Sequence, residues 1–172
     1  MTDFSKLAAR DQDGAIHVVV ETARGMTAKL KFEPKLCAFA FARGLQPGLR
    51  YPYDWGFVPG TVAPDGDPLD AMILYDVTGF PGLVVPCRAI ATLEVEQEER
   101  GRRFRNDRIL LAPMKGDAIP LDQDEKRKLE RFFCDAVRGT GKVLHVIGWR
   151  GAEAAEAEVE RSCQRFRKQA AE

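Results

Sequence analysis

The sequence has few histidines, no closely spaced cysteine pair and no long apolar run, and each absence excludes a class of protein. Two histidines occur among 172 residues, and the four cysteines are widely scattered, so no zinc-site pattern exists. The longest apolar stretch, around residues 79–85, is too short to span a membrane and contains Pro81 and Gly82. The first residues lack the apolar segment of a secretory signal. We therefore expect a cytoplasmic protein with reduced thiols and no membrane partner.

A basic excess is also missing, because Lys plus Arg number 26 and Asp plus Glu number 26. Nucleic-acid-binding proteins usually carry a surplus of positive charge, so the composition predicts no nucleic-acid partner. Apolar residues make up 45% and charged residues 30% of the chain, which is typical of a soluble globular protein. The length suits one hydrophobic core, so we expect a single domain over residues 1–172.

Short strand-like segments dominate the first two-thirds of the chain, and helical periodicity appears only near the end. β-Branched or alternating runs predict strands over residues 15–21, 27–33, 36–42, 83–95, 105–112 and 143–149. Apolar residues at helical spacing predict helices over 122–137 and 152–169, the first opened by a capping box of Asp122 and Glu125. This order predicts an α+β domain built on a small closed barrel.

An acidic turn interrupts the strands at Asp65, Asp67 and Asp70. A glycine and two prolines lie within residues 64–68, so the segment cannot be a continuous helix or strand. Crowded carboxylates repel each other unless a cation sits among them, and oxygen ligands without His or Cys favour Mg²⁺, Mn²⁺ or Ca²⁺. An exposed acidic turn without a metal explains the same pattern, because Asp-Gly and Pro-Asp are common turn formers.

Cationic side chains alternate along a neighbouring predicted strand. Lys29, Lys31 and Glu33 share one face, and Arg43 follows ten residues after Glu33. If this face meets the acidic turn, Arg and Lys together with a metal provide a site for a polyanion such as a phosphate compound. Alternating charges also fit an ordinary solvent-exposed strand face.

The run Tyr51–Gly56 followed by Asp65-Gly-Asp-Pro-Leu-Asp70 closely resembles family I inorganic pyrophosphatases. The D-G-D-P-x-D core begins nine residues beyond a Y-P-x-x-aromatic-G run, and the resemblance extends from about residue 18 to about residue 160. It implies a five-stranded, OB-like closed barrel with flanking helices. It also implies Mg²⁺-dependent hydrolysis of pyrophosphate, with Mn²⁺ as an alternative ion, and a homo-oligomer that is commonly hexameric in bacteria.

The resemblance also implies roles for acidic residues. Asp65 and Asp70 match metal ligands, and Asp67 matches the carboxylate that deprotonates a nucleophile bridging two metals. Glu21 and Glu33 match outer acidic groups that reach metals directly or through water.

On the substrate side, Lys31 and Arg43 match phosphate ligands, and Tyr51 lines the site. Trp55 and Arg108 occupy positions where the family has Tyr and Lys, and we expect them to face the substrate as well.

Other family positions carry different chemistry in this chain. Gln97, approximately, and Asn106 replace two aspartates, so the metal ligands carry less charge unless Asp107 substitutes for one of them. Ala136 and Val137 replace a Tyr-Lys pair that binds the leaving phosphate. Each lost charge-assisted bond is worth about 1.5–3 kcal/mol, or about 10- to 100-fold in rate or affinity. Besides a slowed pyrophosphatase, a hydrolase of another phosphoanhydride and a non-catalytic module that binds phosphate or a partner therefore stay open.

Overall fold

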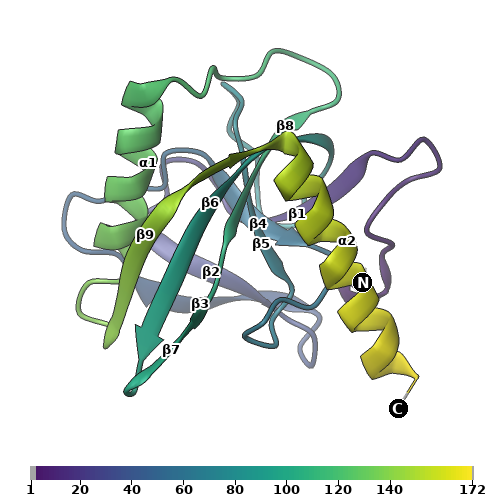
Figure 1. Ribbon diagram of the computed structural model, residues 1–172, viewed down its shortest axis with the longest axis horizontal. Coiled ribbons are helices and arrows are strands. Elements are labelled where there is room, and N and C mark those ends of the chain that lie inside the picture. Colours follow the sequence, from purple (N-terminus) through teal and green to yellow (C-terminus); the bar gives the residue numbers. More distant parts are fainter. Residues whose placement is uncertain (1–2, 172) are drawn as a thin grey trace.

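β-Branched and alternating segments form nine strands, and the two periodic segments form helices, in a computed structural model that describes residues 3–171 (Figure 1). The strands are β1 (Ile16–Thr22), β2 (Ala28–Glu33), β3 (Ala38–Gly44), β4 (Asp54–Val58), β5 (Leu69–Ile73), β6 (Val84–Glu99), β7 (Arg102–Arg105), β8 (Arg108–Pro113) and β9 (Lys142–Gly151). The helices are the short η1 (Phe4–Lys6), α1 (Gln123–Ala136) and α2 (Ala152–Ala170). None of the helices in this part of the chain is both long and apolar enough to cross a membrane.

Five of the strands form a closed ring. Their order is β1-β4-β5-β8-β6, and β6 pairs back with β1. Only the β5–β8 pair is parallel, and the other four pairs are antiparallel. The structure therefore confirms the predicted OB-like five-stranded barrel with flanking helices.

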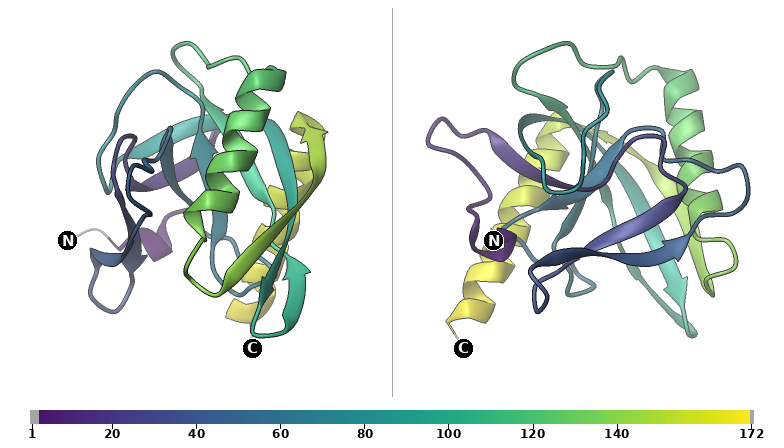
Figure 2. Two further views of the ribbon diagram at one scale, coloured as in Figure 1. Left: turned by 90° about the vertical axis from the view of Figure 1, so that its left-hand side faces the viewer. Right: turned by 180° about the vertical axis from the view of Figure 1, so that it is seen from behind.

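Strand β6 extends beyond the ring and pairs with β9 along one side and with β7 at its end. The β2–β3 hairpin is a separate two-stranded sheet (Figure 2). The ring, the extended β6–β7 hairpin and the β2–β3 hairpin bring loops from distant parts of the sequence together.

Two helices cover different parts of the sheet and complete two apolar cores. Helix α2 adds Ala155, Val159 and Cys163 to the core that fills the ring. Helix α1 packs Phe132 and Phe133 in a second core with Tyr51 and Trp55, among other residues. As predicted, α1 is capped by Asp122, whose carboxylate accepts the Glu125 N–H at 2.9 Å. The Glu125 carboxylate accepts the Tyr53 hydroxyl at 2.8 Å instead of completing the predicted capping box. Figure 1 shows the two helices on opposite sides of the molecule.

Three strands, β4, β5 and β7, were not predicted from the sequence. The segment 54–73 reads as a loop because prolines and glycines punctuate it, yet β4 and β5 form there and β4 is buried along its whole length. The segment between the predicted strands 83–95 and 105–112 also pairs, because β6 continues to Glu99 and β7 begins at Arg102. Pairing with neighbouring strands outweighs the local turn signals in both places.

Candidate functional site

The acidic turn lies between β4 and β5 and is held by its own backbone. The Ala63 N–H donates to the carbonyl of Asp67 at 2.7 Å, and the Asp67 N–H donates to the Asp65 carboxylate at 3.1 Å. Gly66 has a φ of 89°, a conformation that side chains other than glycine disfavour. This turn places Asp65 and Asp67 just before β5, where Asp70 stands opposite Phe57 of β4.

Packing against β1 requires a glycine at position 56, before the acidic turn. A Cβ atom added at Gly56 would lie 1.9 Å from the carbonyl oxygen of Val19 in β1, so no larger residue fits there. The aromatic-glycine run of the sequence is thus partly a requirement of the β1–β4 contact, which in turn positions the strand before the acidic turn.

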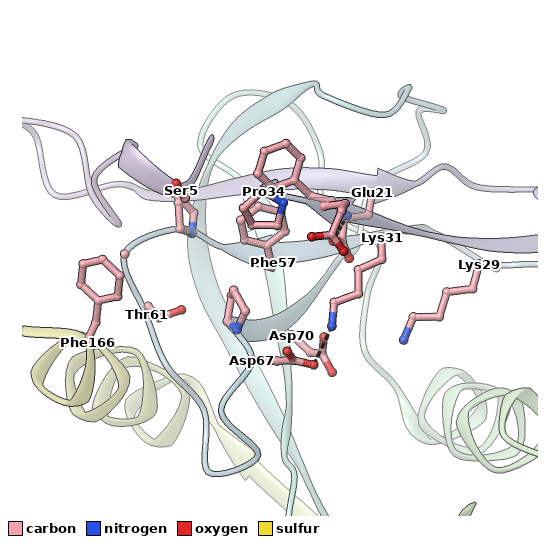
Figure 3. Close-up of a pocket in the computed structure, with 15 residues that line it drawn as sticks. Ser5, Glu21, Lys29, Lys31, Pro34, Phe57, Thr61, Asp67, Asp70 and Phe166 are labelled. Atoms are coloured by element: carbon pink, nitrogen blue, oxygen red, sulfur yellow. Dashed lines mark hydrogen bonds and ion pairs between the residues drawn. The ribbon is translucent and has the colours of Figure 1, made fainter. Parts of the chain in front are cut away.

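The β2–β3 hairpin meets the acidic turn, as the alternating cations suggested. The Lys31 ammonium lies 2.8 Å from the Asp67 carboxylate. Lys29, Lys31, Glu21, Glu33, Asp67 and Asp70 line one cavity of about 300 Å³. In Figure 3 the two lysines point from the hairpin towards the carboxylates of Asp67 and Asp70. Cations and carboxylates from four separate segments therefore face one another.

Glu21 is the buried carboxylate of this cavity. It accepts the Phe32 N–H at 2.7 Å, which fixes its position relative to the hairpin. Burial raises the pKa of the Glu21 carboxyl to about 7, and the negative charge of Asp70 adds to the increase. A nearby cation would stabilise its charged form.

A series of buried polar contacts leads from Asp70 away from the cavity. Arg108 lies 2.9 Å from the Asp70 carboxylate and donates to the side-chain oxygen of Asn106 at 2.7 Å. Asn106 in turn donates to Gln97 at 3.0 Å. The two amides that replace expected aspartates thus contact each other, and their partner Arg108 brings a positive charge to Asp70. Arg108 also lies over the Trp55 ring, 5.6 Å from its centre.

Asp107 does not take part in this series of contacts. Arg105 donates to both of its carboxylate oxygens, at 3.1 and 2.8 Å, and the Val95 N–H donates at 3.0 Å. The side chain lines a different depression with Glu94 and Arg105, among others. The structure therefore brings Asn106 towards Asp70 and leaves Asp107 on another surface.

Tyr51 and Arg43 lie near the same charges. Tyr51 is buried and packs edge-on against Phe132 with ring centres 5.0 Å apart. Burial is the main reason that the pKa of the Tyr51 hydroxyl is raised, and Arg43 opposes that effect. At the end of α1, Ala136 is buried and Val137 is apolar, so these two positions offer no charge to an anion.

Asp54 has a role that sequence reasoning missed. Its fully buried carboxylate accepts the Arg24 N–H at 2.7 Å, the Gly79 N–H at 2.9 Å and the Tyr75 hydroxyl. Three donors from separate segments explain a buried charge here. The sequence gives only the residue type, and nothing in its spacing indicates these donors.

The carboxylates have the chemistry of a hard-cation site, although their side chains are engaged by cations. Within residues 3–171, no cluster of three or more His, Cys, Asp or Glu side chains is close enough to hold a metal ion. Asp67 is paired with Lys31, and Asp70 with Arg108. The oxygen-only donor set of Asp65, Asp70 and Glu21 fits Mg²⁺ or a similar ion better than a zinc-type ion.

Comparisons with known proteins agree with one another. The inorganic pyrophosphatase family profile matches residues 18–167. The inorganic pyrophosphatase of Nostoc sp. is 34% identical, with 96% of this chain and 99% of that protein covered. That of Thermus thermophilus is 32% identical over 88% of this chain and 90% of its own length. Among solved structures, the T. thermophilus pyrophosphatase superposes with a TM-score of 0.86 at 29% identity, covering 96% of this chain and 99% of the other. The Helicobacter pylori pyrophosphatase superposes with a TM-score of 0.83 at 26% identity, covering 94% and 99%.

Proposed function

The chain belongs to the inorganic pyrophosphatase family, and we propose from this premise that it hydrolyses inorganic pyrophosphate to two phosphates at the cavity between the β2–β3 hairpin and the acidic turn. One observation carries the assignment of the site. Lys31 of the hairpin contacts Asp67 of the turn at 2.8 Å, so a phosphate-binding cation and the candidate base face the same space.

We propose Mg²⁺ as the cofactor, with Mn²⁺ as a substitute, held by Asp65 and Asp70 with Glu21 and Glu33 as outer groups. A bound divalent ion supplies positive charge that acidifies water and neutralises phosphate oxygens. Asn106 offers only a neutral oxygen, which Arg108 already engages. Asp107 receives no ligand role, because Arg105 and the Val95 N–H hold it on another surface.

The chain's own residues bind the substrate and move a proton. Asp67 accepts a proton from the attacking water, and its exposed carboxylate is open to the cavity. Lys31 and Arg43 bind phosphate oxygens, the first as a point charge and the second as a planar fork. Tyr51 is buried behind these groups, near Arg43 and Asp70. These groups stabilise charge that develops as the phosphoanhydride bond breaks.

Arg108 and Trp55 act beneath the substrate. Arg108 is buried, contacts Asp70 and lies over the indole ring, so it fixes the carboxylate and adds positive charge at the floor of the site. The Trp55 indole N–H is buried and has no hydrogen-bond partner among residues 3–171. A buried water is a suitable acceptor for it.

A second candidate is hydrolysis of a larger phosphoanhydride. A cavity of about 480 Å³ adjoins the other side of the acidic turn and is lined by Asp65, Asp67, Phe104, Arg102 and Lys142, among others. Cationic and aromatic walls beside the candidate base suit a substrate that extends beyond two phosphates. If no substrate is turned over, the remaining candidate is a module that binds phosphate without catalysis.

One assay tests these functions. Phosphate release is measured from pyrophosphate, from nucleoside triphosphates and from short polyphosphates, each with Mg²⁺ and then with excess chelator. We expect pyrophosphate to be the fastest substrate and chelation to stop the reaction. Faster release from a larger substrate would favour the second candidate, and activity that persists in chelator would exclude the metal role.

Assembly and location are further proposals. We propose a homo-oligomer, hexameric by resemblance to the bacterial family members, and cytoplasmic residence. Sedimentation at several protein concentrations tests the first, and cell fractionation tests the second.

A further inference from the structure

Helix α2 contacts the segment that leads into the acidic turn, through the backbone of Val62. The Val62 N–H donates to the backbone carbonyl of Ser162 at 3.0 Å, and the Arg165 guanidinium donates to the Val62 carbonyl at 2.7 Å. Val62 is buried, and shielded backbone groups need such partners. Both polar backbone groups of a residue three positions before Asp65 are therefore held by the helix.

Other contacts of the acidic turn lie within the turn itself. The Leu69 N–H donates to the Thr61 hydroxyl at 2.9 Å and closes the base of the turn. The Ala63 N–H donates to the Asp67 carbonyl at 2.7 Å. These bonds fix the shape of the turn. A tie to another element is needed to fix where the turn stands relative to Asp70 of β5, and the contact with α2 provides one.

The guanidinium of Arg165 is itself held in position by α2. Glu158, Ser162 and Arg165 are four and three residues apart, so they share one face of the helix. The Glu158 carboxylate accepts from Arg165 at 2.6 Å and from the Ser162 hydroxyl at 3.2 Å. The Ser162 hydroxyl also accepts from Arg165 at 2.8 Å. A planar guanidinium donates in several fixed directions at once, so these bonds direct its remaining donor to Val62.

Stability of the fold does not by itself explain this polar group. Glu158 is buried and Ser162 is fully buried, yet a buried ion pair is a weak source of stability because the loss of hydration offsets much of the attraction. Ala155, Val159 and Cys163 of the same helix already supply apolar contacts to the core of the ring. Placement of the acidic turn gives the polar group a purpose that packing does not.

We propose that Arg165 is a positioning residue of the candidate metal site, because it holds the Val62 carbonyl and thereby keeps Asp65 and Asp67 in place relative to Asp70. Figure 3 shows α2, which carries Phe166, on the opposite side of the cavity from Lys29, so the helix supports the site from the side away from that lysine. A displacement of about 1 Å can lower a rate by about 10²-fold, so such support matters for metal binding and proton transfer.

The inference rests on the proposed function for the role of the carboxylates as metal ligands, whereas the placement of the turn can be tested without a metal. Two matched substitutions are compared with the native chain. Arg165→Met removes the donor to Val62. Arg161→Met removes an equal charge from the same carboxylate, because Arg161 donates to Glu158 at 2.9 and 2.6 Å. Within residues 3–171 the polar contacts of Arg161 are confined to Glu158, so this control leaves the turn attached.

Binding of Mn²⁺ is measured without substrate, from the electron spin resonance signal of the free ion. We expect Arg165→Met to raise the Kd for Mn²⁺ about 5- to 10-fold. Loss of a partner that contacts a metal ligand directly costs about 10- to 100-fold, and Arg165 acts one step further away, through the backbone. The Kd of Arg161→Met should stay within about twofold of the native value.

Hydrogen exchange followed by mass spectrometry is run on the same three proteins in the absence of metal. A peptide that covers residues 61–69 should exchange several-fold faster in Arg165→Met than in the native chain, because the turn has lost its tie to α2. A peptide that covers β1 should exchange at the native rate. In Arg161→Met both peptides should behave as in the native chain.

The outcomes separate this inference from the proposed function. Binding of Mn²⁺ by Arg165→Met that is as tight as in the native chain overturns the positioning role. Equal weakening in both variants also overturns it, since the effect then comes from charge. Faster exchange in every peptide, together with a lowered melting temperature, assigns Arg165 a general structural role and overturns it as well. If the native chain binds no Mn²⁺, the proposed metal role fails, and exchange in the peptide 61–69 alone decides whether Arg165 positions the turn.

Discussion

The Arg108 guanidinium is buried and lies 2.9 Å from the carboxylate of Asp70, which is partly exposed to the cavity. Asp70 is a candidate metal ligand, so a metal ion that approaches it meets a positive charge already in place. The neighbouring Asn106 and Gln97 add no negative charge. The metal affinity of this site therefore depends on the balance of charge between Arg108 and the remaining carboxylates. A single substitution that changes one of these charges should change the affinity.

Asp67→Asn should lower kcat of pyrophosphate hydrolysis by about 10²- to 10⁴-fold, because the amide cannot accept a proton from water. The melting temperature should change little, since Asp67 is exposed and its ion pair with Lys31 contributes about 0–1 kcal/mol at most. Initial rates at saturating substrate and thermal unfolding are measured on the same preparations. Turnover near that of the native chain would move the base role to another carboxylate, with Glu33 as the next candidate.

Asp54→Asn should destabilise the protein by about 1–3 kcal/mol, because the new amide nitrogen replaces an oxygen that accepts the Gly79 N–H and the Tyr75 hydroxyl. Two donors would then face each other in a fully buried place. Urea unfolding monitored by tryptophan fluorescence gives the free energy. Asp76→Asn is the control, since Asp76 is exposed and holds only the Arg24 side chain. Equal stability of the Asp54→Asn and native proteins would show that Asp54 is not a needed acceptor.

Cys87 should resist thiol reagents in the folded protein up to about pH 9. Burial raises the pKa of its thiol to about 12, and the thiolate is the reactive form. The raised pKa contributes stability that is complete below the ordinary thiol pKa and is lost as the pH rises through the folded value. Labelling between pH 7 and 9 with a chromogenic disulfide checks this. The partly exposed Cys37 and Cys134 provide the contrast, and replacing both with serine should remove the fast phase. Labelling of Cys87 at the rate of a free thiol would mean that the core opens locally.

Much of the site was predictable because its residues are close in sequence or on one strand face. The aspartates of the turn lie within residues 65–70, and their metal-like chemistry follows from residue type and spacing. The contact of Lys31 with Asp67 fits the strand alternation that predicted a charged face towards the turn. Helix α1 followed from its apolar periodicity and the cap at Asp122.

Other features depend on register and could not be predicted. The opposition of Lys29 and Arg43 needs the bulge at Ala42, which leaves no signature in the residue types. The contact between Gln97 and Asn106 depends on how β6 and the segment after β7 are aligned. The position of Asp107 away from the cavity is set by its bonds to Arg105 and the Val95 N–H. From the sequence alone, Asp107 was a possible metal ligand in place of a missing aspartate.

The last prediction concerns the strength of metal binding. We expect the native chain to need a high Mg²⁺ concentration, in the millimolar range, because Mg²⁺ holds its water strongly and a site with few anionic ligands competes poorly. Asn106→Asp adds a carboxylate next to Arg108 and near Asp70, so it should lower the Mg²⁺ concentration for half-maximal activity several-fold. Part of the gain will be offset, because the Arg108 guanidinium also binds the new carboxylate.

Asp107→Asn is the matched comparison, since it removes one charge next to the same position. We expect it to leave the Mg²⁺ requirement unchanged, because Asp107 is bound to Arg105 on another surface. Mg²⁺ titrations of activity, and of melting temperature without substrate, are run on the native chain and both variants. A larger effect from Asp107→Asn than from Asn106→Asp would show that Asp107 turns into the site when a metal binds. If neither substitution changes the metal dependence, the segment between β7 and β8 does not contribute to the metal site.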